Sequence, residues 1–188
     1  KAVTFGYQYG AGIDTTAKKA MCDIAEARRI RAKLGSLFSQ LDPWKQRLAL
    51  EIAQRGYVST DTGRRYYLRQ DESYMAVNRI CQGHVGDELK GRMVDIGEYF
   101  IVHGFTDCRI VMNIHDELAV ECPIVQLPVV GPLVYKLMLD SHVEHVVPIP
   151  SDLEVTFTRW SDLKLVENPH LAESYVELIK QFQEGTLV

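Results

Sequence analysis

The chain has 188 residues, of which 46% are hydrophobic and 24% are charged, a composition typical of a globular protein and not of a disordered one. No run approaches the roughly 18 consecutive apolar residues of a membrane-spanning helix, and no signal-peptide pattern opens the sequence, so we expect no membrane partner. The four cysteines, Cys22, Cys81, Cys108 and Cys122, follow no CxxC or zinc-ligand spacing, which favours reduced thiols in a cytosolic compartment.

Charge is distributed unevenly along the chain. Residues 1–92 carry 16 Lys and Arg against 10 Asp and Glu, a net of +6, whereas residues 93–188 carry 5 against 15, a net of −10. This division favours a protein that binds a polyanion with one surface and gathers carboxylates elsewhere; the alternative is solvated charge without a partner. The chain begins with Lys1 rather than Met, which suggests a processed product or a fragment of something longer.

The first residues place a cation and two aromatic rings at helical spacing. Lys1, Phe5 and Tyr9 recur at every fourth position, so on a helix they share one face. An aromatic stripe is normally core, but glycines flank this one and it has little aliphatic bulk around it. A lysine binds phosphate as a point charge, and rings offer stacking surfaces to nucleobases. The stripe therefore predicts a nucleotide-binding face.

Residues 15–54 predict two helices, one over residues 15–34 and one over residues 43–54, separated by Gly35 and a turn at 41–43. Two β-rich arms, residues 56–60 and 64–68, then flank a loop that contains Gly63, which predicts an antiparallel hairpin. Arg64 and Arg65 follow its turn, where they either clamp a backbone phosphate or brace a neighbouring carboxylate.

Residues 73–101 return to helical periodicity, and Asn78 and Gln82 lie one turn apart on one face. Buried amides need hydrogen-bond partners. Amides that face a groove can instead donate to the base N3 and O2 atoms of the minor groove, which checks base-pair geometry without reading sequence.

Two apolar arms surround a polar centre in residues 109–123. Ile110-Val111-Met112 and Leu118-Ala119-Val120 flank His115-Asp116-Glu117, which predicts an antiparallel hairpin with the acidic pair at its tip. Carboxylate oxygens suit Mg²⁺, which usually takes one or two protein carboxylates together with waters and substrate phosphates. The alternatives are a solvated turn and a metal hydrolase, although a hydrolase would place a His-Asp pair on a helix and need further ligands.

The rest of the chain predicts a Pro-punctuated connection over residues 123–132, a short helix over 133–143, a strand over 153–160 and an amphipathic helix over 171–182. With the two hairpins and the helices before them, this pattern predicts an α+β fold in which antiparallel hairpins pack on helices.

Taken together and in this order, the motifs resemble the C-terminal part of family A DNA polymerases, the bacterial repair and phage replicative type. The family's fingers helix carries Lys, then Phe or Tyr, then Tyr-Gly at four-residue steps. Its Gly-Tyr-Val … Gly-Arg-Arg hairpin, its Asn-x-x-x-Gln-Gly helix and its His-Asp-Glu turn follow. The matching residues here are Lys1, Phe5 and Tyr9-Gly10; Gly56-Tyr57-Val58 and Gly63-Arg64-Arg65; Asn78, Gln82 and Gly83; and His115-Asp116-Glu117.

The resemblance implies a role in nucleotide binding for three of these residues. Lys1 would bind the incoming triphosphate and act as general acid for the leaving pyrophosphate. Phe5 would pack on the sugar, where Phe rather than Tyr goes with discrimination against dideoxynucleotides. Tyr9 would guard the templating position.

The resemblance also implies DNA and metal roles. Asn78 and Gln82 would probe the minor groove, and His115 would contact the primer terminus. Asp116 would hold the catalytic Mg²⁺ pair, with Glu117 assisting nearby. The partners would be primer–template DNA and a deoxynucleoside triphosphate (dNTP).

Departures from the family pattern limit what this chain does alone. The family's fingers arginine would precede Lys1, and Tyr74 stands where the family has an arginine before its Asn. In the family, the second catalytic aspartate comes from a strand before the fingers helix, and no such motif precedes Lys1 here. Two-metal phosphoryl transfer needs both carboxylates. We therefore expect a companion polypeptide or segment that carries the thumb and the other aspartate.

The resemblance divides the chain into the end of the fingers subdomain (residues 1–56), a palm subdomain with the His-Asp-Glu hairpin (residues 57–160) and a helical extension (residues 161–188). A bacterial or phage-infected cytoplasm is the expected location. The rival hypothesis is a non-catalytic DNA-binding or assembly subunit that retains polymerase architecture. Retention of Lys1, Phe5, Tyr9 and Asp116 together argues against it, because DNA binding alone does not need that set.

Overall fold

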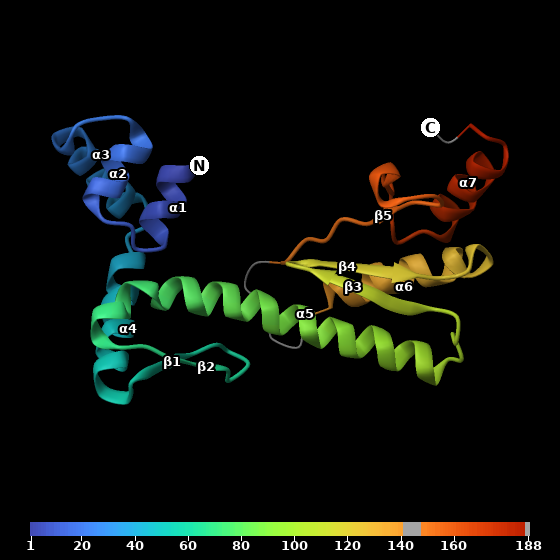
Figure 1. Ribbon diagram of the computed structural model, residues 1–188, viewed down its shortest axis with the longest axis horizontal. Helices are drawn as coiled ribbons and strands as arrows, with labels where there is room; N and C mark the ends of the chain where they lie inside the picture. Colours follow the sequence, from blue (N-terminus) through green and yellow to red (C-terminus); the bar gives the residue numbers. More distant parts are fainter. Residues whose placement is uncertain (141–147, 187–188) are drawn as a thin grey trace. The chain divides into compact units, whose positions relative to one another are not determined.

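The computed structural model describes residues 1–140 and 148–186. The chain forms two compact units, Lys1–Val85 and Gly86–Val188, and each is described here by itself. The described residues form seven α-helices and three separate two-stranded antiparallel sheets (Figure 1). The predicted α+β class, with hairpins packed on helices, is confirmed. The subdomain boundaries expected at residues 56 and 160 stay a prediction.

Four helices open the first unit: α1 (Ala2–Gln8), α2 (Ile13–Ala20), α3 (Ile24–Leu37) and α4 (Leu41–Arg55). The single helix predicted over residues 15–34 was therefore wrong. Met21 ends α2 in the left-handed conformation, with φ of 53°. Asp23 then caps α3, because its side chain accepts a hydrogen bond of 2.7 Å from the Glu26 N–H. Gly35 lies inside α3 and not between helices.

The first predicted hairpin is present as β1 (Tyr57–Ser59) and β2 (Arg65–Tyr67), paired with Ser59 opposite Arg65. Alternation along the strands sends Val58 and Tyr66 to the core side of the ribbon. Val58 is fully buried with Leu48 and Ile52 of α4, so the hairpin is fixed on helical packing and not on a larger sheet.

A 3₁₀ turn, η1 (Gln70–Met75), leads into α5 (Ala76–Val102), and the helix predicted over residues 73–101 is confirmed. Early in α5, Gly83 makes room for the ring of Tyr66, which approaches so closely that a Cβ at this position would overlap it. The Asn78–Gln82 segment of α5 is therefore held against the β1–β2 hairpin.

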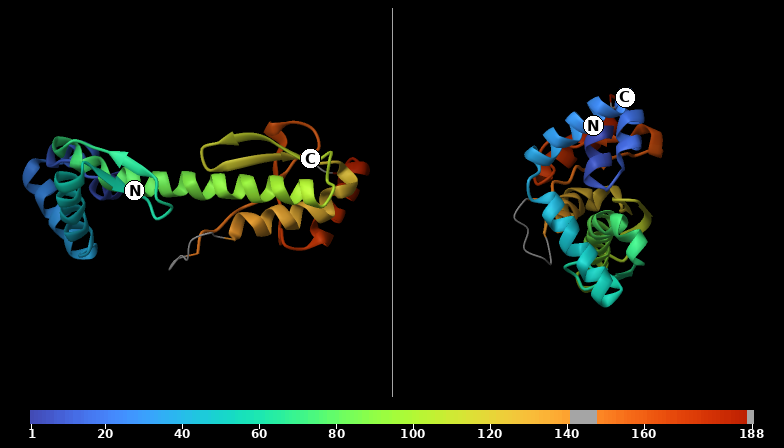
Figure 2. Two further views of the ribbon diagram at one scale, coloured as in Figure 1. Left: turned by 90° about the horizontal axis from the view of Figure 1, so that it is seen from below. Right: turned by 90° about the vertical axis from the view of Figure 1, so that its left-hand side faces the viewer.

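The second predicted hairpin is present as β3 (Arg109–Ile114) and β4 (Glu117–Glu121). It runs along the later part of α5, as does α6 (Leu127–Leu139) (Figure 2). The three elements share one apolar cluster, which includes Ile96, Phe100 and Val130. The connection predicted over residues 123–132 was wrong, because η2 (Ile124–Gln126) and the first turns of α6 occupy it. Proline is tolerated in a first helical turn, and α6 also contains Pro132. The predicted helix end at residue 143 lies outside the described residues.

The strand predicted over residues 153–160 is much shorter: β5 (Glu154–Val155) pairs with β6 (Lys164–Leu165) across a turn that contains η3 (Trp160–Asp162). Side-chain hydrogen bonds stop the strand. Asp162 accepts from the Thr158 hydroxyl at 2.8 Å and from the Arg159 Nε at 3.0 Å. The hydrogen bond from Thr158, followed by those from Ser161 and Arg159, lowers the pKa of Asp162.

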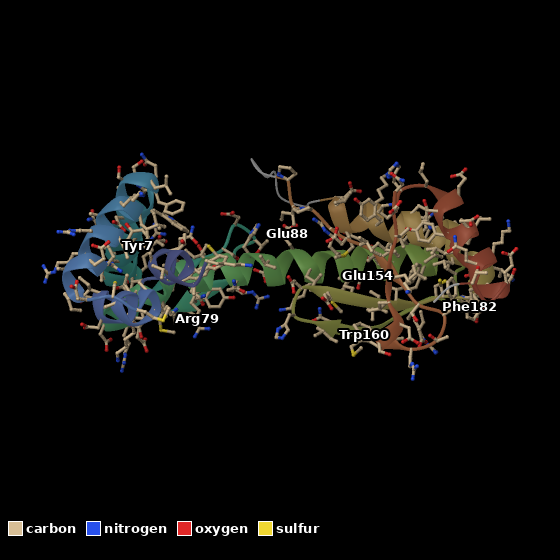
Figure 3. All side chains as sticks on the ribbon, turned by 90° about the horizontal axis from the view of Figure 1, so that it is seen from above. Tyr7, Arg79, Glu88, Glu154, Trp160 and Phe182 are labelled. Carbon is tan, nitrogen blue, oxygen red and sulfur yellow. The ribbon has the colours of Figure 1, made fainter. Side chains whose placement is uncertain are left out.

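The terminal helix predicted over residues 171–182 is confirmed as α7 (Ala172–Gln183). It packs on α6, where the fully buried ring of Tyr175 lies against Gly131. At the other end of α7, Phe182, labelled in Figure 3, stacks on Phe157 with ring centroids 4.7 Å apart. Within the described ranges, no helix has the length and apolar character needed to cross a membrane.

Candidate functional site

One face of α1 carries the predicted cation and rings side by side. The rings of Phe5 and Tyr9 are stacked, with centroids 6.4 Å apart and planes 9° from parallel. The Lys1 Nζ lies 6.0 Å from the centroid of the Phe5 ring, near the limit of a cation–π contact. Lys1 is exposed and Phe5 is 45% exposed, so the charge and the first ring remain open to a ligand. We call Lys1, Phe5 and Tyr9 the α1 face.

The opposite side of α1 is anchored by Tyr7, labelled in Figure 3, which is 2% exposed. Its hydroxyl donates a 2.8 Å hydrogen bond to the Asp42 Oδ2 of α4. The Lys45 Nζ donates to the Tyr7 carbonyl oxygen at 2.8 Å and lies 4.5 Å from the ring centroid. Burial, and then the hydrogen bond to Asp42, raises the pKa of the Tyr7 phenol. These contacts set the rotation of α1, which leaves Lys1 and Phe5 exposed on its other side.

Gly10 ends α1 in a Schellman arrangement. The Ala11 N–H bonds to the Gly6 carbonyl at 2.8 Å and the Gly10 N–H bonds to the Tyr7 carbonyl at 3.3 Å. Gly10 has φ of 85°, and a Cβ there would lie 2.7 Å from the Tyr74 carbonyl oxygen. Gly10 thus brings the end of α1 against η1, directly before α5. Tyr9 packs partly against the core cluster to which Ala76 and Val77 belong.

Asn78 and Gln82 lie one turn apart on α5, as predicted, with Asn78 half-buried and Gln82 exposed. On the hairpin, Arg65 shares the exposed side of the ribbon with Tyr57, and its guanidinium carbon lies 4.8 Å from the centroid of that ring. Arg64 is also exposed. The first unit therefore carries the α1 face, two amides and two arginines.

The acidic turn belongs to the second unit. His115 and Asp116 form a two-residue turn between Ile114 and Glu117, and His115 has φ of 55°. Histidine is one of the residues more often found at positive φ. His115, Asp116 and Glu117 are all exposed. At the hairpin base Arg109 donates two hydrogen bonds to the Glu121 Oε2, at 3.0 and 2.8 Å.

The acidic turn is also the predicted metal site. Residues 1–140 and 148–186 hold no group of three His, Cys, Asp or Glu side chains placed to bind one ion. The exposed carboxylate of Asp116, with Glu117 beside it in sequence, fits the one or two protein carboxylates that Mg²⁺ commonly takes. The role of Asp116 in holding Mg²⁺ therefore stays a prediction.

Two features of the molecule were missed by sequence reasoning. The first is Tyr7, which holds α1 in place. In the sequence, its only signal is its position on the side of α1 opposite the α1 face. Glu88 and Arg92 of α5 form a buried ion pair of 2.8 Å, with side chains 7% and 5% exposed. Their i, i+4 spacing was visible in the sequence, but such spacing usually indicates an exposed pair.

A helix with a cation and two rings on one face, then one hairpin, a long helix and a second hairpin with an acidic turn, is the order expected of a polymerase. It places the chain among α+β proteins of the polymerase kind. The chain belongs to DNA polymerase family A, whose family model matches residues 1–162.

Relatives and a solved structure agree with this family. The chain is 26% identical to DNA polymerase theta of Drosophila melanogaster over 88% of its own length and 9% of that protein. It is 28% identical to the thermostable DNA polymerase I of Thermus aquaticus over 82% of its length and 19% of that protein. The chain thus spans less than a fifth of these relatives. The fold is similar to the polymerase domain of Pol1 from M. smegmatis in complex with DNA primer-template and dNTP, with a TM-score of 0.67, 24% identity, and coverage of 73% of this chain and 26% of that one.

Proposed function

We propose that this chain forms the C-terminal fingers and palm portion of a DNA polymerase and takes part in template-directed DNA synthesis. The reaction is attack of a primer 3′-hydroxyl on the α-phosphorus of a dNTP, with pyrophosphate as the leaving group. The observation that carries the proposal is the α1 face: a cation and two stacked rings on one helix, in a chain whose family match covers residues 1–162.

In this proposal the α1 face binds the incoming nucleotide. The exposed ammonium of Lys1 contacts the triphosphate, and a proton on its Nζ is available to the departing pyrophosphate. The Phe5 ring packs on the sugar. Tyr9, which is partly packed on the core, stays fixed beside the templating position. Positioning and charge stabilisation supply most of the catalysis in phosphoryl transfer, so a face held in place by Tyr7 suits this task.

The DNA contacts come from both units. Asn78 and Gln82 donate to minor-groove acceptors that every base pair presents, so they check geometry and not sequence. Arg64 and Arg65 contact backbone phosphate, supported by their exposure and by the excess of cations in residues 1–92. His115 contacts the primer terminus.

Asp116 would hold Mg²⁺, with Glu117 assisting. Such ions stabilise the charge that develops on the phosphoryl oxygens when they are bound. The chain's own part is to present the Asp116 carboxylate at a turn whose strands are fixed by the Arg109–Glu121 hydrogen bonds.

The remaining carboxylate is proposed to come from a companion polypeptide or segment, which also carries the thumb. The ground for this proposal is chemical: two-metal phosphoryl transfer needs carboxylates that bridge both ions, and the acidic turn supplies Asp116 with Glu117 beside it. Because a polymerase acts where its template lies, we propose the cytoplasm of a bacterium or of a phage-infected cell.

The test is primer extension by the chain mixed with the companion that its source encodes beside it, in the presence of Mg²⁺. Asp116→Asn keeps the size of the side chain and removes its charge, so we expect extension to be lost while primer–template binding stays within about twofold. Asp107→Asn, at an exposed position before β3, is the matched control and should extend normally. Full extension by Asp116→Asn would remove Asp116 from the mechanism. If the wild-type mixture binds primer–template but never extends it, the non-catalytic DNA-binding or assembly subunit becomes the better description.

A further inference from the structure

A groove of about 460 Å³ lies at the connection between α3 and α4, away from the α1 face. Two aromatic side chains, Phe38 and Trp44, line it together with the aliphatic Leu37 and the polar Gln40 and Arg47. None of these residues has a part in the proposed catalytic reaction.

The groove combines stacking surface with positive charge. Trp44 is half-buried and packs against the core cluster of Leu48 and Ile52, so its indole is held while it lines the groove. Arg47, one turn along α4, is exposed and makes no ion pair with any residue that the structure describes. Aromatic rings beside an unpaired arginine are the combination by which proteins bind unpaired bases and their phosphates.

Charge around the groove favours a polyanion over an apolar partner. Residues 1–85 carry 14 Lys and Arg against 8 Asp and Glu, a net of +6. The two carboxylates of α4 already have partners: Glu51, four positions after Arg47, pairs with Arg55 at 3.3 Å, and Asp42 accepts from Tyr7 at 2.8 Å and pairs with Lys45 at 3.4 Å. Lys33, exposed one turn before Leu37 on α3, adds a second cation on the same side of that helix.

We propose that this groove binds an unpaired nucleobase of single-stranded DNA, such as the template overhang beyond a primer–template duplex. The base stacks on the rings of Trp44 and Phe38, and Arg47 contacts the neighbouring phosphate. The inference rests on the proposed function, because it assumes that the first unit meets DNA.

The fluorescence of Trp44 can be used to detect binding in the groove. The chain has two tryptophans, Trp44 and Trp160, and Trp160, labelled in Figure 3, belongs to η3 of the second unit. In a Trp160→Phe background, oligothymidine should quench the remaining fluorescence by stacking. An abasic strand of the same length has the phosphates without the bases and should leave the fluorescence unchanged. Anisotropy of a labelled strand measures total binding in the same samples.

Two substitutions separate stacking from charge. Phe38→Leu should weaken oligothymidine binding about 5- to 150-fold, the range found when one base–aromatic stack is removed. Arg47→Ala, at an exposed position that leaves the core intact, should lower the slope of log affinity against log salt by about 0.7. Arg28→Ala on α3, the same charge change outside the groove, should leave the Trp44 quenching amplitude unchanged.

The outcomes distinguish this inference from the proposed function. If labelled DNA binds but Trp44 is not quenched, or if the abasic strand quenches it equally, the groove does not bind bases while the proposed function stands. If Phe38→Leu and Arg47→Ala both bind like the parent, the groove proposal is overturned in the same way. If the chain mixed with its companion binds DNA of neither kind, both proposals fail.

Discussion

Replacing Gly10 by alanine tests how α1 is held. Gly10 has φ of 85°, and a Cβ there would lie 2.7 Å from the Tyr74 carbonyl oxygen. The left-handed conformation costs a residue with a Cβ about 1–2 kcal/mol. The second contact is with backbone, which cannot rotate away as a side chain would, and such overpacking typically costs about 1–3 kcal/mol. We therefore expect Gly10→Ala to lower the free energy of unfolding by about 2–5 kcal/mol.

Gly56 provides a matched control. It ends α4 as Gly10 ends α1, with φ of 76°, but a Cβ at Gly56 would meet nothing within 4 Å. Gly56→Ala should therefore lower the free energy of unfolding only by the cost of the left-handed backbone, about 1–2 kcal/mol. The difference between the two variants measures the contact between Gly10 and Tyr74.

The assay is urea unfolding followed by helical circular dichroism, with the free energies compared at equal slope. Equal losses in the two variants would refute the packing of Gly10 on Tyr74. No loss in either would refute the left-handed helix ends. A larger loss for Gly10→Ala, accompanied by weaker dNTP binding, would show that this packing also sets the α1 face.

Three further predictions concern charge and burial. Lys1→Ala should weaken dNTP binding about 10- to 150-fold, as expected for a lost charge-assisted contact, whereas Lys18→Ala on α2 should change it little; equal affinities would refute the phosphate role. Because the pKa of Tyr7 is raised, its stabilisation is complete below the ordinary value of about 10 and is lost as pH rises through the folded-state pKa. Tyr7→Phe should therefore lose about 0.5–1.5 kcal/mol at neutral pH and show a shallower decline in unfolding free energy above about pH 10; a parallel decline would contradict this. Arg92→Met should lower the free energy of unfolding in urea by about 3–5 kcal/mol, because it leaves the Glu88 carboxylate buried without Arg92. Adding Glu88→Leu should restore most of this loss. Additive losses would show that Glu88 and Arg92 are not coupled.

The hairpins and the long helix were predictable because their signals are local. Two apolar arms around a short polar turn predict a hairpin over residues 109–121. They do not fix its register, which a β-bulge between Ile110 and Met112 shifts. Helical periodicity over residues 73–101 is long enough to outweigh its four glycines, Gly83, Gly86, Gly91 and Gly97.

The failures come from interactions that periodicity does not contain. Residues 15–34 have helix-forming composition throughout, yet the left-handed Met21 and the Asp23 cap divide them. Residues 153–160 alternate as a strand would, but the hydrogen bonds to Asp162 turn the chain after Val155. In both cases a polar side chain offers the backbone an alternative to continuing the element.

The candidate site, too, was predictable only in part from the sequence. The spacing of Lys1, Phe5 and Tyr9 was predictable because four residues are close to one helical turn. The packing that holds them was not, since it depends on Asp42, 35 positions beyond Tyr7 in sequence. The groove at Phe38 and Trp44 likewise forms only where α3 meets α4.

The family signature therefore contains two kinds of residue. Lys1 and Asp116 are exposed and contribute little to packing, so their conservative replacement should change activity without changing stability. Gly10 and Gly83 are required by close approaches to Tyr74 and Tyr66, and their replacement should act first on stability. If a conservative substitution of Lys1 or Asp116 lowered stability as well as activity, that residue would also support the fold, which its exposure argues against.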